Sequence, residues 1–463
     1  MLDKHDLMNE AVLKRAALLI ATLASFLTPF MVSSINIALP AMGREFSMSA
    51  VMMSWVPTSY LLAAAMFLVP FGRLADIIGR KKIFSCGMWI FTVSSLLLAF
   101  SPSAAVLITL RVIQGFGSAM IFGTGMAILT SVFPASERGR VLGINVAAVY
   151  LGLSCGPVFG GFLTQQLGWR SIFLVNVPIG MLVIYFVSRK LTLEWADAQG
   201  EKFDLTGALI YSLSLVAVMY GLSQLPAEIG MLLMLFGIIS TAAFVVWETK
   251  APAPLLNTDL FLHNIAFAFS NLAALINYSA TFAVTFLLSL YLQYIKGFTP
   301  QHTGMVLIAQ PVVMAIFSPY AGRLSDKIEP RVVASIGMGF TAAGLFLFTF
   351  IGKDTPLGSI ITGLVLLGFG FSLFSSPNTN AVMSSIEKRY YGVGSAMLGT
   401  MRLTGQMMSM GIAMLIFALH IGGARITPEN YPVFMTSVRT AFMIFAALCF
   451  GGIFASLARG KVR

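Results

Sequence analysis

The residues best able to do chemistry form a short charged turn that occurs twice in the chain. One copy begins at Gly72 and ends at Lys81, and the other begins at Gly322 and ends at Arg331, 250 positions further on. Each copy lies between two apolar stretches and combines a glycine, a carboxylate and several cations, which can form and break ion pairs at a membrane surface. We predict that Asp76 latches two parts of the molecule together, whereas the lysines beside it only set the topology. The candidate latch residues are Gly72, Arg73, Asp76, Gly79, Arg80, Arg323 and Asp326.

Two arginines form a second candidate site, because Arg111 and Arg402 are the only charged residues deep within the apolar stretches. A buried arginine costs ~2.5–3.5 kcal/mol on membrane-insertion scales, so each is expected to have a partner or a function. Hydrogen bonding to carbonyl groups of a neighbouring helix is the ordinary alternative for both. Arginine cannot carry a proton by itself, and none of the 18 acidic residues lies near the middle of an apolar stretch.

The elements that must position these residues are membrane-spanning helices. Apolar residues make up 57% of the chain and charged residues only 10%, against about 25% charged in soluble proteins. We find fourteen apolar runs of the roughly 20 residues that a bilayer requires. The sequence therefore predicts an all-α integral membrane protein with fourteen transmembrane helices. The runs are centred near residues 28, 62, 92, 115, 153, 180, 214, 238, 278, 313, 341, 367, 405 and 447.

The basic residues predict the orientation of these helices. If both termini are cytoplasmic, most of the 29 lysines and arginines fall in the inner loops and tails. The outer loops then hold only a few, and the net charge of +11 reflects topology rather than a nucleic-acid surface. The longest inner segment, 189–204, is highly charged and is expected at the interface. The basic residues assigned to the outer loops are Arg44, Arg170, Lys296, Lys353, Arg425 and Arg439.

The repeated turn indicates two related halves. The sequence similarity between the two halves continues downstream, where Gly115-Phe116-Gly117 is matched by Gly368-Phe369-Gly370. Two halves of six helices leave two helices over, at roughly 205–247, for which we expect a peripheral position. The predicted divisions are a first six-helix bundle at 1–190, a linker with the two extra helices at 191–260, and a second six-helix bundle at 261–463.

The fifth apolar run carries a stripe of small residues. Ala148, Gly152, Gly156 and Gly160 recur every four residues and so share one face of a helix. Such a face allows another helix to approach closely, and Pro157 bends the helix locally. Ordinary helix packing is the alternative to a functional role. The complete pattern consists of Gly143, Gly152, Gly156, Pro157, Gly160 and Gly161.

Polar side chains also recur along two equivalent helices. Asn36 shares one face of the first run with a serine and a threonine, and Asn271 and Tyr278 do the same in the ninth. Lipid cannot satisfy such groups, so they are expected to face either a central cavity or another helix. The same pattern in two equivalent helices favours a shared cavity.

These motifs together resemble the major facilitator superfamily. The Gly72 turn is similar to that superfamily's loop between helices 2 and 3, Arg111 to Gly117 to its helix 4 motif, and Gly143 to Gly161 to its antiporter motif. The phrase that begins at Trp169 resembles the fourteen-helix drug:proton antiporters of the EmrB/QacA-like group. The resemblance implies two bundles that rock about a central cavity, driven by proton flow. It also makes Arg111 the stronger candidate for coupling or substrate contact.

The chain departs from that group at one position. Its members commonly carry an aspartate in helix 1, five residues before the asparagine that corresponds to Asn36, but this chain has Met31 there. A proton carrier and a binding partner for a cationic drug are therefore both missing from that helix. Two functions remain open. The first is export of amphipathic drug-like compounds across the cytoplasmic membrane, with proton antiport. The second is export of an organic anion or lipid-like substrate held by Arg111 and Arg402, without a carboxylate to carry protons.

Other classes of function are disfavoured. An enzyme would need a cluster of His, Asp or Glu at one interface, and we predict no catalytic residues, no metal site and no cofactor. No Gly-x-x-x-x-Gly-Lys-Ser/Thr phrase occurs, so ATP is not expected as the energy source, and nucleic acid is not expected as a partner. The expected partners are a small-molecule substrate, protons and the lipid bilayer. The candidate coupling or substrate residues are Asn36, Arg111, Gln114, Asn271, Tyr278 and Arg402.

Overall fold

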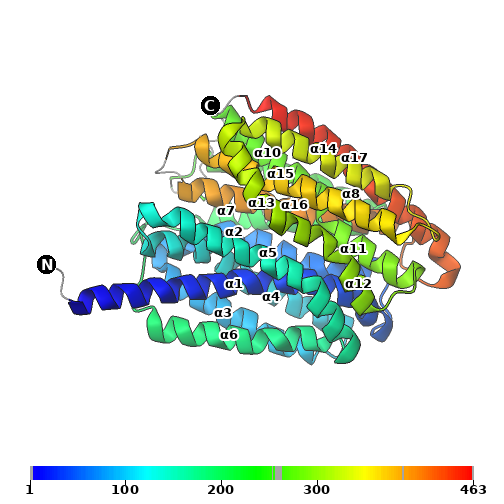
Figure 1. Ribbon diagram of the computed structural model, residues 1–463, viewed down its shortest axis with the longest axis horizontal. Coiled ribbons are helices and arrows are strands. Elements are labelled where there is room, and N and C mark those ends of the chain that lie inside the picture. Colours follow the sequence, from blue (N-terminus) through cyan, green and yellow to red (C-terminus); the bar gives the residue numbers. More distant parts are fainter. Residues whose placement is uncertain (1–3, 253, 256–262, 388–390, 461–463) are drawn as a thin grey trace.

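The computed structural model describes residues 4–252, 254–255, 263–387 and 391–460. This part of the chain is built from helices joined by short connections (Figure 1). Fourteen segments are long and apolar enough to cross a membrane, as the hydropathy pattern predicts. The prediction of an all-α, fourteen-span membrane protein is confirmed. The predicted boundary between the linker and the second bundle, at 260–261, lies outside the described residues.

The helices of the first half follow one another closely. Several of them begin at a residue whose side chain accepts a hydrogen bond from a free backbone N–H group. Ser49 accepts from Met52 at the start of the second helix, and Ser103 accepts from Val106 at the start of the fourth. The six helices are α1 (Lys4–Glu45), α2 (Ala50–Ile78), α3 (Arg80–Ala99), α4 (Ala104–Val132), α5 (Ala135–Gln166) and α6 (Arg170–Lys190). An extended segment then leads to the two extra helices, α7 (Leu205–Gln224) and α8 (Glu228–Glu248).

The second half has the same number of spans, two of which are interrupted. The ninth span consists of α10 (Ile265–Thr281), α11 (Ala283–Leu290) and a π-helical turn, η1 (Tyr291–Ile295). The tenth consists of α12 (Pro300–Leu307) and α13 (Ala309–Lys327). The remaining elements are α14 (Pro330–Phe348), α15 (Leu357–Ser384), α16 (Tyr391–His420), the short 3-10 helix η3 (Pro428–Asn430) and α17 (Tyr431–Ala458).

Equivalent helices pack in equivalent ways. In the first half α1 packs on α5, and α4 packs between α2 and α3. In the second half α10 packs on α16, and α15 packs between α13 and α14. The halves meet along two seams, α2 with α16 and α5 with α12 and α13.

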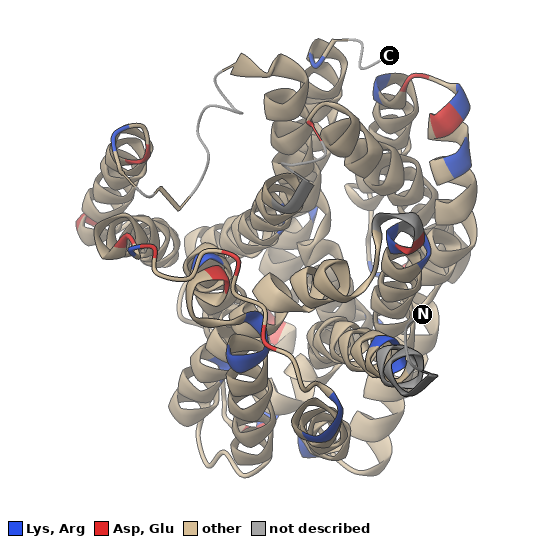
Figure 2. Ribbon diagram, turned by 90° about the vertical axis from the view of Figure 1, so that its left-hand side faces the viewer, with Lys and Arg blue, Asp and Glu red and all other residues tan. Residues whose placement is uncertain are grey.

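Both ends of the chain lie at the same end of the molecule, which we call the terminal side (Figure 1). Viewed from there, lysine, arginine and the acidic residues gather on the loops and helix ends nearest the viewer (Figure 2). We call the opposite end the far side. Three residues assigned to the outer loops lie within helices instead. Arg44 is in the last turn of α1, Arg170 is the first residue of α6, and Arg439 lies within α17, which already begins at Tyr431.

The two extra helices differ in their surroundings. α8 is largely exposed along its length. α7 packs against α2 and α16, which belong to different halves. The Tyr211 hydroxyl donates to the carbonyl of Ala65 at 3.0 Å, and the Ser212 hydroxyl donates to that of Met66 at 3.3 Å. The expected peripheral position therefore describes α8, whereas α7 covers a seam between the halves.

Candidate functional site

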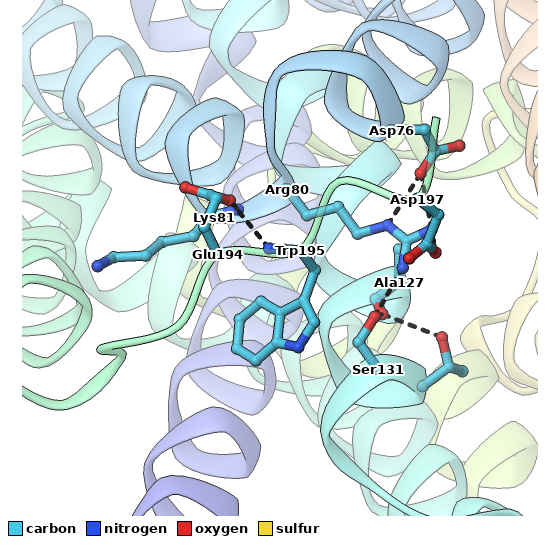
Figure 3. Close-up of polar contacts among 9 residues, drawn as sticks. Asp76, Arg80, Lys81, Ala127, Ser131, Glu194, Trp195 and Asp197 are labelled. Atoms are coloured by element: carbon cyan, nitrogen blue, oxygen red, sulfur yellow. Dashed lines mark hydrogen bonds and ion pairs between the residues drawn. The ribbon is translucent and has the colours of Figure 1, made fainter. Parts of the chain in front are cut away.

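The charged turn between α2 and α3 is closed by an internal ion pair (Figure 3). Gly79 joins the helices with φ of 122°, a conformation that glycine adopts without strain. Asp76, one turn before the end of α2, accepts from the Nε and Nη2 atoms of Arg80 at 2.9 and 2.7 Å. Arg80 also donates to the hydroxyl of Ser131 on α4 at 2.6 Å. The turn is thus anchored to the first bundle.

An acidic segment, Glu194–Glu201, lies across this turn. The Arg80 guanidinium pairs with Asp197 at 2.7 Å, and Arg73 pairs with Glu201 at 2.5 Å. A carboxylate oxygen of Glu194 accepts from the backbone N–H of Lys81 at 2.8 Å. The segment belongs to the connection between α6 and α7, so the turn of the first bundle also holds the chain that leads to the extra helices.

Backbone hydrogen bonds fix the acidic segment in register. The N–H of Arg80 donates to the carbonyl of Trp195 at 2.8 Å, and the N–H of Ala198 donates to that of Asp76 at 2.9 Å. A Cβ atom at Gly79 would lie 2.5 Å from the Glu194 carboxylate. Glycine is therefore required at this position by both the backbone conformation and the close approach. The segment 189–204, expected only to lie at the interface, is a partner of the turn.

The second copy of the turn has different neighbours. Asp326 accepts from the amide of Asn380 on α15 at 3.4 Å, and the same amide donates to Ser325 at 3.0 Å. Arg323 is exposed, and Gly322 faces the hydroxyl of Ser376 on α15. In this conformation the first turn contacts its own bundle and the acidic segment, and the second turn contacts α15 of its own bundle. The latch from Asp76 to the second bundle stays a prediction.

Arg111 is completely buried inside the first bundle. Its guanidinium lies 4.2 Å from the ring centre of Tyr60, and its Nε atom donates to the carbonyl of Val56 at 3.2 Å. It also donates to Gln114, whose amide donates to Ser95 at 2.7 Å. These partners lie on α2, α3 and α4. The structure therefore brings Arg111 and Gln114 together, but it gives them helix-packing contacts rather than a position between the bundles.

Arg402 lies in a different setting, half-buried on α16. It lies near the hydroxyl of Tyr278 on α10, which also lies near Ser375 on α15. Tyr150, on α5 of the first bundle, lies close enough to interact electrostatically with Tyr278. Arg402 and Tyr278, both predicted from sequence, are thus brought together at the boundary between the bundles. We call Arg402, Tyr278, Ser375 and Tyr150 the arginine cluster.

Asn36 and Asn271 are buried rather than exposed to a cavity. The amide of Asn271 donates to the carbonyl of Phe267 within its own helix at 2.9 Å. For these two residues the structure favours packing among helices, which the sequence left open beside the cavity. Tyr278 alone of the three polar residues predicted on these helices reaches the arginine cluster.

The small-residue face of α5 packs directly on α1. A Cβ atom at Gly152 would lie 2.5 Å from the Phe26 carbonyl oxygen, and one at Gly156 would lie 2.5 Å from Cβ of Ser33. Gly160 is similarly close to Ser34, whose hydroxyl donates to the carbonyl of Gly156 at 3.0 Å. The predicted close approach of a second helix is confirmed.

Two of the remaining positions of this motif, Pro157 and Gly161, face the second half. Gly161 lies against the backbone of Pro300, and the carbonyl of Pro157 contacts Gly304. Gly143, nearest the terminal side, has no side-chain or neighbouring atom within 4 Å of its Cβ position. The motif therefore joins α5 to α1 and, near the far side, to α12.

Hydrogen bonds between the bundles cluster toward the far side. The Ser289 hydroxyl on α11 donates to the carbonyl of Asn36 at 2.6 Å, and the Gln293 amide on η1 donates to that of Ile37 at 2.9 Å. Pro40 has no N–H, so the carbonyl of Asn36, four residues earlier, lacks its helical donor. The second half supplies the missing donor. We call these two hydrogen bonds the far-side lock.

Local backbone geometry positions the two donors. Ser289 and Gln293 are four residues apart and so share a helix face, and the π-helical turn at Tyr291–Ile295 begins between them. π-helical turns are frequent at functional sites. Sequence reasoning missed the lock, although Pro40 was a signal, because a proline inside a long helix always frees a carbonyl for an outside donor.

Arg459 is a buried cation that the sequence analysis treated only as a topological charge. Its guanidinium donates to Asn378 at 2.9 Å and to the hydroxyl of Ser270 at 3.3 Å, and it also bonds to Ser456. Burial lowers its pKa to about 10, so it remains charged at neutral pH. Arg459 therefore ties α10, α15 and α17 together at the terminal side.

Comparison with known proteins assigns the family. The sequence pattern of the Major Facilitator Superfamily matches residues 21–251 and 270–461. The riboflavin transporter RibZ of Clostridioides difficile is 28% identical over 95% of this chain and 96% of its own length. The cephamycin export protein CmcT of Amycolatopsis lactamdurans is 32% identical over 86% of this chain and 84% of its own.

Further similarities agree with this assignment. The multidrug resistance protein Stp of Mycobacterium tuberculosis is 31% identical over 82% of this chain and 71% of its own length. A peptide transporter POT, crystallised with sulfate, has the same fold, with a TM-score of 0.70, 14% identity and 94% of each chain covered. Its low identity supports the fold alone. The chain therefore belongs to the major facilitator superfamily and is a multi-pass membrane transporter of small molecules.

Proposed function

We propose that this protein exports amphipathic compounds across the cytoplasmic membrane by alternating access. Both termini are then cytoplasmic, because the basic residues gather on the terminal side. Relatives named for multidrug resistance and for export of cephamycin support export, and a relative named as a riboflavin transporter supports a small organic substrate.

The far-side lock is the observation that carries this proposal. Two hydrogen bonds from α11 and η1 hold the first bundle at α1, and α12 packs on α5 at the same side. Toward the terminal side a long hydrogen bond joins the bundles, from the Ser395 hydroxyl to the sulfur of Met126 at 3.8 Å. The conformation is that of a transporter closed to the outside and ready to load from the cytoplasm.

Proton antiport remains part of the proposal, with the proton carried near the cytoplasmic surface. The described acidic residues lie in loops, near helix ends or before the first apolar span. Asp76, together with Asp197 and Glu201 of the acidic segment, forms the densest group of carboxylates beside cations. We assign a role in gating to this group, because breaking these ion pairs would release the turn.

A second candidate function, export of an organic anion, is favoured by the arginine cluster. Arg402 is half-buried at the bundle boundary, where it neighbours the hydroxyl of Tyr278. An anionic or strongly hydrogen-bond-accepting group on the substrate would complete this cluster. Arg111 is the weaker candidate for the same role, because side chains and carbonyls of its own bundle surround it.

Transport in proteoliposomes tests both functions. Purified protein is reconstituted with an imposed pH gradient, and cationic, neutral and anionic amphipathic dyes are compared side by side. Gradient-dependent movement of dyes supports the antiporter. Preference for anionic dyes without pH dependence favours the second function and refutes proton antiport. Failure to move any dye class, in protein whose thermal unfolding shows it to be folded, contradicts the proposal as a whole.

A further inference from the structure

The far-side lock depends on the π-helical turn η1, because this turn carries the Gln293 donor. The N–H of Lys296 donates to the carbonyl of Tyr291, five residues earlier, at 3.2 Å, which is the π-helical pattern. Such turns are rare. The contacts that hold η1 in place therefore also decide whether the Gln293 amide reaches the carbonyl of Ile37 on α1.

Tyr291, which begins η1, and Lys296, which directly follows it, both bind the loop between α14 and α15. The Tyr291 hydroxyl donates to the carbonyl of Gly352 at 2.7 Å. The Lys296 ammonium donates to two further carbonyls of the loop, that of Lys353 at 2.5 Å and that of Thr355 at 2.7 Å. The lock donor of η1 lies between these two anchors along the chain, so the loop fixes the backbone that presents it.

The loop is also bound by α17. The Nε atom of Arg439 donates to the carbonyl of Ile351 at 2.7 Å. An irregular loop leaves backbone carbonyls without helical donors, and side chains of α17 and of the ninth span supply them here. These three elements therefore form one connected unit at the far end of the second bundle. We call the contacts of Tyr291, Lys296 and Arg439 with the loop 351–355 the second clamp.

The first bundle has contacts at the equivalent place, made by different chemistry. Arg170, at the start of α6, binds both carboxylate oxygens of Glu45, at the end of α1, at 2.9 and 2.7 Å. The Nε1 atom of Trp169 donates to the same carboxylate at 2.7 Å, and Arg170 donates to the carbonyl of Ser101, between α3 and α4, at 3.3 Å. We call these contacts the first clamp. It fastens α1, the helix that carries the acceptors of the far-side lock.

The two clamps join equivalent elements of the two halves. Each connects the first span of its half with the loop between the third and fourth spans and with the sixth span. The connection is the same although one clamp is built on an ion pair and the other on donors to backbone carbonyls, which points to a mechanical role rather than to local packing. If the bundles separate as units, the hydrogen bonds of the lock break while those within each clamp remain.

We propose that Tyr291 and Lys296 are positioning residues for the far-side lock. By binding the α14–α15 loop they hold η1 so that the Gln293 amide meets α1, and the first clamp holds α1 in the same way. This role rests on the proposed alternating access, because a lock at the far side acts only in a transporter that opens there. The clamps then transmit the movement of each whole bundle to the lock.

A double-mutant cycle tests whether the second clamp acts through Gln293. The three native cysteines are replaced, and spin labels are attached to single cysteines at Leu167 and Leu419, which are exposed at far-side ends of opposite bundles. The distance between the labels in liposomes gives the ratio of far-side-open to far-side-closed protein. We expect Tyr291→Phe with Lys296→Met to raise this ratio about twofold to tenfold, the effect of losing one hydrogen bond. When Gln293→Leu is already present, the same pair of substitutions is expected to add nothing.

The matched control is Lys353→Met, which removes a lysine of the same loop but keeps the backbone carbonyl that Lys296 binds. We expect this control to leave the ratio unchanged. An equal rise with and without Gln293→Leu would overturn the proposal, because the clamp would then act independently of the lock. An unchanged ratio in the folded clamp variant or in Gln293→Leu alone, or a rise in the control as large as in the clamp variant, would overturn it as well.

Two further variants cover the case in which the clamp variant fails to fold. Lys296→Arg keeps donors for the loop carbonyls, so we expect a ratio close to that of the wild type. Glu45→Gln removes the charge that pairs with Arg170 in the first clamp, and we expect it to raise the ratio; an unchanged ratio contradicts the role of that clamp. These measurements need no substrate. If wild-type protein moves no dye but the cycle is non-additive as expected, the export function fails and the positioning role stands.

Discussion

Removing the far-side lock is predicted to open the far side of the transporter. The double substitution Ser289→Ala and Gln293→Leu deletes both donors that cross from the second bundle to α1. A hydrogen bond contributes ~0.5–1.5 kcal/mol net, and a buried carbonyl left without a donor costs ~1–3 kcal/mol. The carbonyl of Asn36 has no helical donor to replace Ser289, because Pro40 follows four residues later.

The magnitude follows from these two contacts. Taking ~1–1.5 kcal/mol for each, the double variant loses ~2–3 kcal/mol of stability in the far-side-closed state. An equilibrium that favours this state then shifts by a factor of roughly 30 to 150 toward the far-side-open state. The single variants are expected to shift it by the square root of this factor, if the two bonds act independently.

Pulsed electron paramagnetic resonance measures this shift. Spin labels at Leu167 and Asp354, both exposed at far-side ends of opposite bundles, report the distance across the far side. We expect a longer distance to become the major population in the double variant. The matched control is Ser279→Ala, because that hydroxyl donates to Leu275 within its own helix at 2.7 Å. An unchanged distance distribution in the double variant, or an equal change in the control, would refute the reasoning.

Three further predictions concern other parts of the site. Asp76→Asn removes the negative charge that pairs with Arg80, so transport is expected to slow while the protein still inserts; a normal initial rate in proteoliposomes contradicts this role. Gly156→Val places side-chain atoms where Ser33 lies, and is expected to lower the free energy of unfolding by ~1–3 kcal/mol, measured as a lower Tm. An unchanged Tm would mean that α5 can move away from α1, and would contradict the need for glycine at this position. Arg402→Ala is expected to reduce transport of anionic dyes much more than of neutral ones, whereas Arg402→Lys retains part of it; equal losses for both dye classes remove Arg402 from substrate binding.

The fold could be predicted from the sequence because a membrane permits few kinds of spanning structure. A bilayer requires about 20 apolar residues for each crossing, and these stretches stand out in the chain without any knowledge of packing. The stripe through Gly152 and Gly156 was readable for a similar reason, since only small side chains permit helices to approach so closely. Arg439 was misplaced because its charge interrupts the apolar run, although α17 already begins eight residues earlier at Tyr431.

The site was less predictable because its contacts are tertiary. Arg111 and Arg402 look alike in the sequence, yet one is enclosed by its own bundle and the other lies at the boundary between bundles. The acidic segment pairs with Arg73 and Arg80 across more than a hundred residues, and no local pattern indicates that pairing. The acceptors of the far-side lock are backbone carbonyls, which the sequence does not mark directly. Pro40 is an indirect sign, because it leaves the carbonyl of Asn36 without its helical donor.

The most direct test of the central claim is to measure both sides of the molecule in one experiment. Spin-label pairs are placed across the far side at Leu167 and Asp354, and across the terminal side at Arg140 and Lys327, all of which are exposed. Distances are recorded in liposomes before and after a pH gradient is imposed. Alternating access predicts opposite changes, with the far side opening as the terminal side closes. Distances that lengthen together, or that stay fixed while dye is transported, would contradict the account.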